Sequence, residues 1–173
     1  RTTAEGLVAV VAEGTSAAIV EVNAETDFVA RNDQFQALVR NVAKAALKGA
    51  GKVEEVAEVV IEGGKSVKDT LTTLIATIGE NMSLRRSAKL AVNDGIVATY
   101  VHNAIGDGLG KIGVLVALES AGDKAKLEAL GKQIAMHVAA FNPVAVNAES
   151  VSADLIAKEK EIAEAKALES GKP

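Results

Sequence analysis

Few residues in this chain of 173 have the type and spacing that covalent chemistry requires. The two histidines, His102 and His137, belong to no HExxH or similar ligand spacing. The sequence has no cysteine, which excludes disulfides, thiolate metal sites and cysteine nucleophiles together. Ser16 does not belong to a GxSxG nucleophile elbow, because Ala18 stands where the second glycine is required. The sequence therefore predicts neither a catalytic group nor a metal site.

Two glycine-containing segments have partial likeness to phosphate-binding loops. Gly64-Lys65-Ser66 has the last three residues of a P-loop, but Val59 occupies the position of its first glycine. Residues 106–110 read GDGLG between two predicted strands, whereas a dinucleotide-binding loop needs a helix there to direct its positive end at the phosphates. We interpret this segment as a hairpin turn. We therefore expect no cofactor, no nucleotide site and no enzymatic activity.

Composition and charge narrow the classes of partner. The chain has 19 basic and 23 acidic residues, a net charge of −4 and no dense basic run, which argues against direct binding to nucleic acid. Its apolar runs are too short to cross a bilayer, so no membrane association is expected. The chain begins at Arg1 without a signal-type apolar region, and we interpret it as a fragment of a longer protein.

Hydrophobic periodicity predicts a β-hairpin followed by a helix in the first part of the chain. The strands span about 7–12 and 17–23, and Asn32 caps a helix that runs to about residue 47. Apolar residues at spacings of three and four give this helix one buried face. Beyond it, the sequence predicts a short helix over 53–61, a helix over 66–78 capped by Ser66, and a strand over 82–92.

The same pattern begins again at Gly95. Strands over 95–101 and 113–119 form a second predicted hairpin, and a helix over 124–140 follows it. We therefore predict an α+β fold of two related subdomains, each an antiparallel hairpin or sheet packed with helices. A chance likeness between two amphipathic units is the alternative. The first copy is longer before its helix, and the added residues include Thr26–Val29.

The predicted domains are an N-terminal core subdomain over 1–94, a C-terminal core subdomain over 95–150, and the first helix of a helical hairpin arm over 151–173. The narrow apolar stripe of this last helix is typical of a helix pair or coiled coil. The helix that would cover the stripe is missing from the sequence. A homodimer through this truncated arm stays open as an alternative.

Phe28 is an unusual residue for its position, since the chain has three phenylalanines and this one lies in a polar loop. One interpretation is packing, in which Phe28 and Val29 fasten the following helix to the sheet. The other is an aromatic anchor for a partner, because a buried aromatic is a frequent hot spot of interfaces. The residues alone do not decide between the two.

Several segments, in this order, resemble the sequence motifs of one family. Residues 21–32 read EVNAETDFVARN and residues 78–86 read IGENMSLRR, and both are similar to motifs of bacterial elongation factor Ts. Four further blocks resemble the same family: Tyr100-Val101-His102, residues 112–116 (IGVLV), residues 134–140 (IAMHVAA) and residues 170–173 (SGKP). The resemblance covers essentially the whole chain.

This resemblance implies a function in bacterial translation elongation, in the cytoplasm. Proteins of the family bind elongation factor Tu with GDP, disturb its Mg²⁺ and phosphate site, and promote GDP release so that GTP can bind. The motif assigns Mg²⁺ displacement to Thr26, Asp27, Phe28 and Val29. It gives weaker partner contacts to His102, Ile78 and Gly79. An α+β interaction or oligomerisation module with no nucleotide-linked partner is the alternative function.

Overall fold

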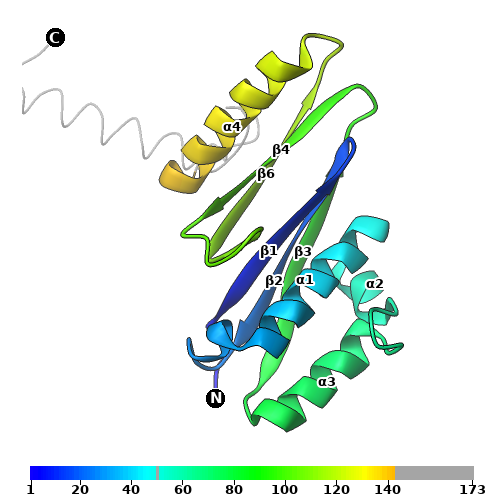
Figure 1. Ribbon diagram of the computed structural model, residues 1–173, viewed down its shortest axis with the longest axis vertical. Coiled ribbons are helices and arrows are strands. Elements are labelled where there is room, and N and C mark those ends of the chain that lie inside the picture. Colours follow the sequence, from blue (N-terminus) through cyan, green and yellow to red (C-terminus); the bar gives the residue numbers. More distant parts are fainter. Residues whose placement is uncertain (50, 143–173) are drawn as a thin grey trace, which may run out of the picture. The chain divides into compact units, whose positions relative to one another are not determined.

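Two antiparallel sheets and four α-helices make up the structure, a computed structural model that describes residues 1–49 and 51–142 (Figure 1). Residues Arg1–Ala140 form one compact body. The strands are β1 (Glu5–Glu13), β2 (Ser16–Ala24), β3 (Met82–Ala91), β4 (Gly95–His102), β5 (Leu109–Gly110) and β6 (Ile112–Glu119). The helices are the 3-10 turn η1 (Val29–Arg31), α1 (Asp33–Lys48), α2 (Val53–Glu58), α3 (Val67–Ile78) and α4 (Lys124–Phe141). The predicted α+β class is thus confirmed.

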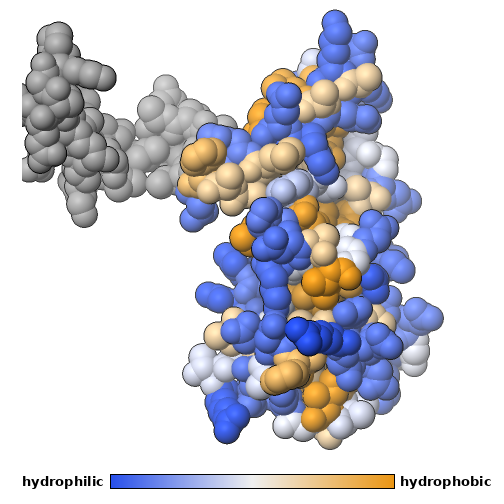
Figure 2. All heavy atoms as spheres, turned by 60° about the vertical axis from the view of Figure 1, so that its left-hand side comes forward, coloured by the Kyte–Doolittle hydropathy of each residue, from blue (hydrophilic) through white to orange (hydrophobic). Residues whose placement is uncertain are grey.

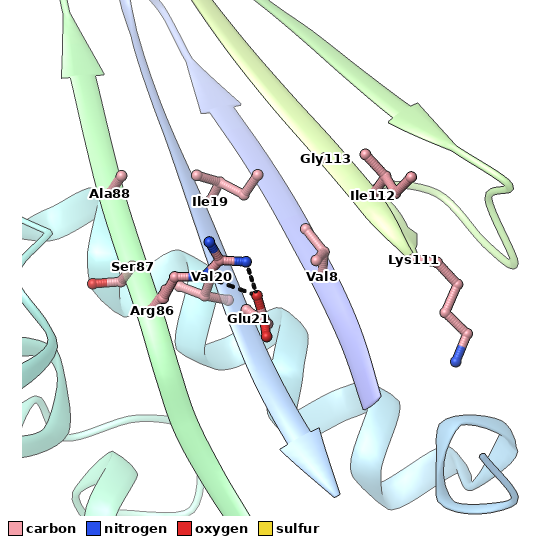
Figure 3. Close-up of a pocket in the computed structure, with 10 residues that line it drawn as sticks. All are labelled: Val8, Ile19, Val20, Glu21, Arg86, Ser87, Ala88, Lys111, Ile112 and Gly113. Carbon is pink, nitrogen blue, oxygen red and sulfur yellow. Dashed lines mark hydrogen bonds and ion pairs between the residues drawn. The ribbon is translucent and has the colours of Figure 1, made fainter. Parts of the chain in front are cut away.

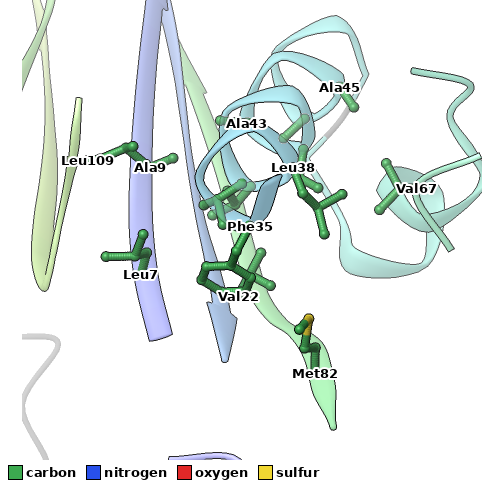
Figure 4. Close-up of a cluster of buried hydrophobic side chains, with 14 of the residues drawn as sticks. Leu7, Ala9, Val22, Phe35, Leu38, Ala43, Ala45, Val67, Met82 and Leu109 are labelled. Carbon is green, nitrogen blue, oxygen red and sulfur yellow. The ribbon is translucent and has the colours of Figure 1, made fainter. Parts of the chain in front are cut away.

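The first sheet has the order β3-β2-β1-β5 and is antiparallel throughout. Alternate residues of β1 and β2, among them Leu7, Ala9, Val20 and Val22, point toward α1 and form the core with its apolar face. Phe35 of α1 is fully buried at the centre of this cluster (Figure 4). The core is therefore one continuous cluster of mostly aliphatic side chains around the single aromatic ring of Phe35.

Local capping explains where the two long helices of the first part begin. The Asn32 side chain accepts a hydrogen bond of 3.0 Å from the Phe35 amide, so α1 begins after it, as predicted. Ser66 accepts one of 3.1 Å from the Asp69 amide at the start of α3. Gly79 ends α3 in a left-handed conformation, with φ 81°.

The second sheet consists of β4 and β6 and packs on the face of β1 and β2 that is opposite to α1. At Gly113 of β6, an added Cβ would lie 2.7 Å from the side chains of Ile19 and Val8. The glycine therefore permits close contact between the two sheets. Because both faces of β1 are covered, Leu7, Val8 and Ala9 are all buried in succession.

The two hairpins share a detail of their backbone geometry. Gly6 and Gly95 open β1 and β4 with φ values of 134° and 146°, and each pairs with the end of its partner strand, at Asn23 and Glu119. A Cβ at Gly6 would lie 2.2 Å from the Val22 carbonyl oxygen, and one at Gly95 would lie 2.0 Å from that of Leu118. The two units thus share a backbone geometry that only glycine fits.

Beyond shifts of one or two residues at element ends, two segments differ from what the sequence predicts. The short helix predicted over 53–61 ends at Glu58, because Val59 is extended and Val60 forms a β-bridge with Ser66. Leu109 and Gly110, predicted as part of a turn, pair with β1 as a short strand. Neither pairing is visible in a local sequence pattern. Leu109 and Gly110 pair with β1, which is distant in the chain, and Val60 meets Ser66 only because the turn between them brings them together.

The predicted helix of the arm, 151–173, lies outside the described residues. The subdomain boundaries at 94 and 150 stay predictions. No helix in the described part of the chain has the length and hydropathy needed to cross a membrane.

Candidate functional site

The loop that connects β2 to α1 exposes one aromatic side chain on an otherwise ordered turn. Phe28 is 80% exposed, whereas Val29, the next residue, is 4% exposed. Backbone hydrogen bonds of 3.2 Å from the Ala30 amide to the Asp27 carbonyl and 3.1 Å from the Arg31 amide to the Phe28 carbonyl close the turn. The ring of Phe28 therefore points to solvent from a backbone that the turn and Val29 hold in place.

This geometry tests the packing interpretation of Phe28 and Val29. Phe28 does not fasten α1 to the sheet, since most of its surface is exposed. Val29 does, because its side chain belongs to the core cluster with Phe35. Of the four predicted loop residues, Asp27 and Phe28 are exposed to solvent, while the buried side chain of Val29 anchors the loop in the core.

The loop is joined to the turn after α3 by two sets of hydrogen bonds. Glu80 accepts both hydrogen bonds of Thr26, 2.7 Å from its hydroxyl to Oε1 and 3.2 Å from its amide to Oε2. Glu25 Oε1 accepts a hydrogen bond of 2.8 Å from the Asn81 amide. Ile78 and Gly79 immediately precede this turn, so the structure brings the two predicted segments together.

A third connection comes from the second hairpin. The Lys111 ammonium donates to the Asp27 carboxylate, with which it forms an ion pair, and donates a hydrogen bond of 3.0 Å to the Gly6 carbonyl oxygen. The hydrogen bond from Lys111 lowers the pKa of Asp27, and the charge of Lys111 adds to the effect. Asp27 is therefore ionised at neutral pH and tied to the start of β6.

His102 lies at the end of β4 and is exposed, away from the residues that hold the loop. Its Nδ1 is 3.1 Å from the Tyr100 hydroxyl, and Lys132 Nζ lies 5.4 Å from the centre of the Tyr100 ring. His102 pairs with Ile112, the residue after Lys111. The structure thus places it on the same hairpin as Lys111, without bringing it to Phe28 through a shared contact.

Sequence reasoning missed four residues that hold the loop: Glu25, Glu80, Asn81 and Lys111. Glu80 and Asn81 lie inside the IGEN motif, but only Ile78 and Gly79 were singled out from it. Lys111 follows the glycine-rich turn and carries no recognisable pattern of its own. The available signal was therefore the motif around Glu80, and no comparable local signal existed for Lys111.

The other polar cluster of interest lines a cavity of about 380 Å³ beside β6, on the sheet face opposite α1 (Figure 3). A bulge in the β2–β3 pairing brings both Arg85 and Arg86 to Glu21, with Arg85 at 3.5 Å. Burial raises the pKa of Glu21, but hydrogen bonds from Arg86 and Asn23 and the charges of both arginines outweigh it, so the pKa is lowered. Glu21 is therefore a paired carboxylate and a poor proton acceptor near neutral pH.

The described surface carries several exposed apolar side chains besides its polar clusters. Within residues 1–49 and 51–142, no three His, Asp or Glu side chains come together as metal ligands would. Hydrophobic side chains form separate patches among hydrophilic ones on the face drawn in Figure 2. Exposed apolar residues include Phe28, Val60 at 62% and Leu130 at 49%. Only Phe28 among these three belongs to a loop held by side-chain hydrogen bonds from a distant turn. The fold and site thus define an α+β protein that exposes an aromatic side chain on an ordered loop.

Comparison with known proteins identifies the family. The model of the family described as "Elongation factor TS" matches residues 25–173. The chain is 58% identical over 174 aligned positions to elongation factor Ts of Rhizobium etli (strain CIAT 652), covering all of this chain and 56% of the relative. It is 56% identical to that of Rhizobium meliloti (strain 1021) and 55% identical to that of Bartonella henselae, in each case over all of this chain and 57% of the relative.

The chain therefore belongs to the elongation factor Ts family of bacterial translation elongation factors, which confirms the resemblance of its motifs. It spans a little over half the length of the curated relatives that it matches.

Proposed function

We propose that this chain is a guanine-nucleotide exchange factor that binds elongation factor Tu carrying GDP and promotes release of the nucleotide. The observation that carries the proposal is Phe28, an aromatic side chain 80% exposed on a loop that is fixed on two sides. An exposed ring gains nothing for folding, whereas its burial in a partner contributes about 1.5–3 kcal/mol. Family membership supports elongation factor Tu as the partner, and we propose that the chain acts in the bacterial cytoplasm.

The proposed mechanism needs no covalent step and no cofactor of this chain. In the partner, Mg²⁺ and backbone amides would hold the GDP phosphates. Phe28 would enter beside that site and favour a partner conformation in which the Mg²⁺ site is broken. The free energy comes from the differential affinity of this chain for the two partner conformations. By reciprocity, Mg²⁺ and GDP must weaken the binding of this chain as much as it weakens theirs.

The loop residues have different parts in this proposal. Phe28 is the inserted side chain, and Asp27 is accessible beside it. Thr26 and Val29 hold the backbone, through Glu80 and through the core. His102, Ile78 and Gly79 are proposed as further contacts, since the structure exposes His102 and Gly79 and half-buries Ile78.

The test is the rate at which the chain releases fluorescent GDP from elongation factor Tu. We expect Phe28→Ala to slow release about 30-fold or more, the effect of losing an interface hot spot. The melting temperature should change little, because the ring makes little contact with the fold. Val60→Ala, which removes an apolar side chain that is 62% exposed elsewhere, is the matched control and should leave the rate unchanged.

A Phe28→Ala rate equal to that of the parent chain would contradict the proposal. It would favour an interaction module with no nucleotide-linked partner.

A further inference from the structure

We infer that Glu80 is a positioning residue that sets the direction of the Phe28 side chain. Glu80 precedes β3, and it accepts hydrogen bonds from Thr26, which follows the neighbouring strand β2. The inference rests on the proposed function and adds a residue to it. Glu80 lies 54 positions from Thr26 in the sequence, yet its carboxylate accepts both the amide and the hydroxyl hydrogen bond of that residue. Together with Glu25 and Asn81 it forms what we call the carboxylate clamp.

The register of the first sheet explains why these residues meet. Ala24 at the end of β2 pairs with Met82 at the start of β3. In an antiparallel pair, the next residues outward, Glu25 with Asn81 and Thr26 with Glu80, lie opposite each other. The three hydrogen bonds follow this order, with one of 2.8 Å in the first pair and two of 2.7 and 3.2 Å in the second. The clamp thus continues the strand pairing with side-chain acceptors.

The carboxylate is the group that this position requires. Each Glu80 oxygen accepts one hydrogen bond from Thr26, and both residues are half-buried. A glutamine would keep one oxygen, but its amide nitrogen cannot accept the remaining hydrogen bond. Glu80→Gln therefore removes one contact of the clamp while it preserves the size of the side chain.

Order in this loop matters because Phe28 is exposed before it meets a partner. A loop that must be ordered on binding loses affinity, and a loop ordered beforehand does not. The ion pair from Lys111 to Asp27 also restrains the loop, but Asp27 and Lys111 are 58% and 37% exposed. Exposed ion pairs contribute little, so we expect the half-buried contact between Glu80 and Thr26 to set the ring direction.

The experiment measures fluorescent-GDP release from elongation factor Tu by the full chain and its variants. Glu80→Gln and Thr26→Val should each slow release about tenfold, the effect of losing one charge-assisted hydrogen bond. Thr26→Ser keeps the hydroxyl and should restore the rate. Glu62→Gln, at an exposed glutamate of the loop before α3, is the matched control and should have no effect.

Two readouts separate positioning from other roles. Hydrogen exchange at the Thr26 amide should be faster in Glu80→Gln at an unchanged melting temperature. In a Phe28→Ala background, Glu80→Gln should cause no further slowing, because the clamp acts through the ring. An additive effect would show that Glu80 itself touches the partner and would overturn the inference.

The failure of this inference differs from that of the proposed function. If Phe28→Ala slows release while Glu80→Gln and Thr26→Val match the parent chain, the inference is overturned and the proposed function stands. If Phe28→Ala has no effect, both are overturned. A loss of rate that only follows a lower melting temperature would assign the clamp to stability and overturn the inference.

Discussion

The two hairpin-and-helix units of this chain share a plan but differ in burial. Helix α1 of the first unit, with 16 residues, buries a continuous apolar face around Phe35. Helix α4 of the second unit, with 18 residues, buries only Gly131 and Ala135. Residues of β1 and β2 are mostly buried, whereas those of β4 and β6 are mostly half-buried.

The difference shows where a structured loop can be added. The first unit has a core of its own and a second layer on its other face, so its strand ends are fixed on both sides. The loop of Phe28 belongs to this unit, and the second unit contributes Lys111 to it. A functional side chain on a loop is held most accurately where the supporting residues are themselves packed.

The sharpest way to test the comparison is to truncate equivalent helix positions. The apolar spacing of the two helices matches Phe35, near the start of α1, with Leu127, near the start of α4. We expect Phe35→Ala to lower the free energy of unfolding by about 3–5 kcal/mol, because it empties the centre of the core. Leu127 is half-buried, and Leu127→Ala should cost about 1 kcal/mol. Chemical denaturation of both variants measures the difference.

Equal losses at Phe35 and Leu127 would contradict the comparison. They would mean that the second unit has a core as well packed as the first.

A smaller effect is expected where the two units are alike. Gly6→Ala and Gly95→Ala each place a Cβ against a carbonyl oxygen at positive φ, with separations of 2.2 and 2.0 Å. Both should destabilise by about 1–3 kcal/mol, the usual cost of backbone strain. Thermal unfolding of the two variants, beside Gly14→Ala at an open turn position, measures it. A harmless Gly95→Ala with a damaging Gly6→Ala would break the structural equivalence of the hairpins.

The smallest effect concerns the contact between the units, at Asp27 and Lys111. Lys111→Met should raise the pKa of Asp27 toward its ordinary value, because the hydrogen bond from Lys111 is the main cause of the lowered pKa. An NMR titration of the Asp27 carboxyl carbon in both chains measures the shift. An unchanged pKa would show that Lys111 does not hold the loop in solution.

The pH dependence of that ion pair follows from the same shift. A carboxyl with a lowered folded-state pKa adds to stability above its ordinary pKa. The contribution is lost as the pH falls through the lowered pKa. Parent and Lys111→Met chains should therefore differ near neutral pH and converge in acid.

Much of the fold could be predicted from the sequence, because its elements depend on local patterns. Alternation and helical spacing locate both hairpins and the helices α1, α3 and α4, and Asn32 and Ser66 cap helices where expected. The helix α2 ends earlier than predicted, since Val60 pairs with Ser66.

The candidate site divides in the same way. The sequence by itself determines that an aromatic residue lies in a polar loop and that the loop resembles a family motif. Only the tertiary structure decides that Phe28 is exposed while Val29 is buried, because burial depends on which side chains of the sheet and of α1 pack against the turn. Glu80 and Lys111 reach the loop from 54 and 84 positions away, through strand register and sheet packing. Such contacts depend on long-range pairing, which no local pattern of residues specifies.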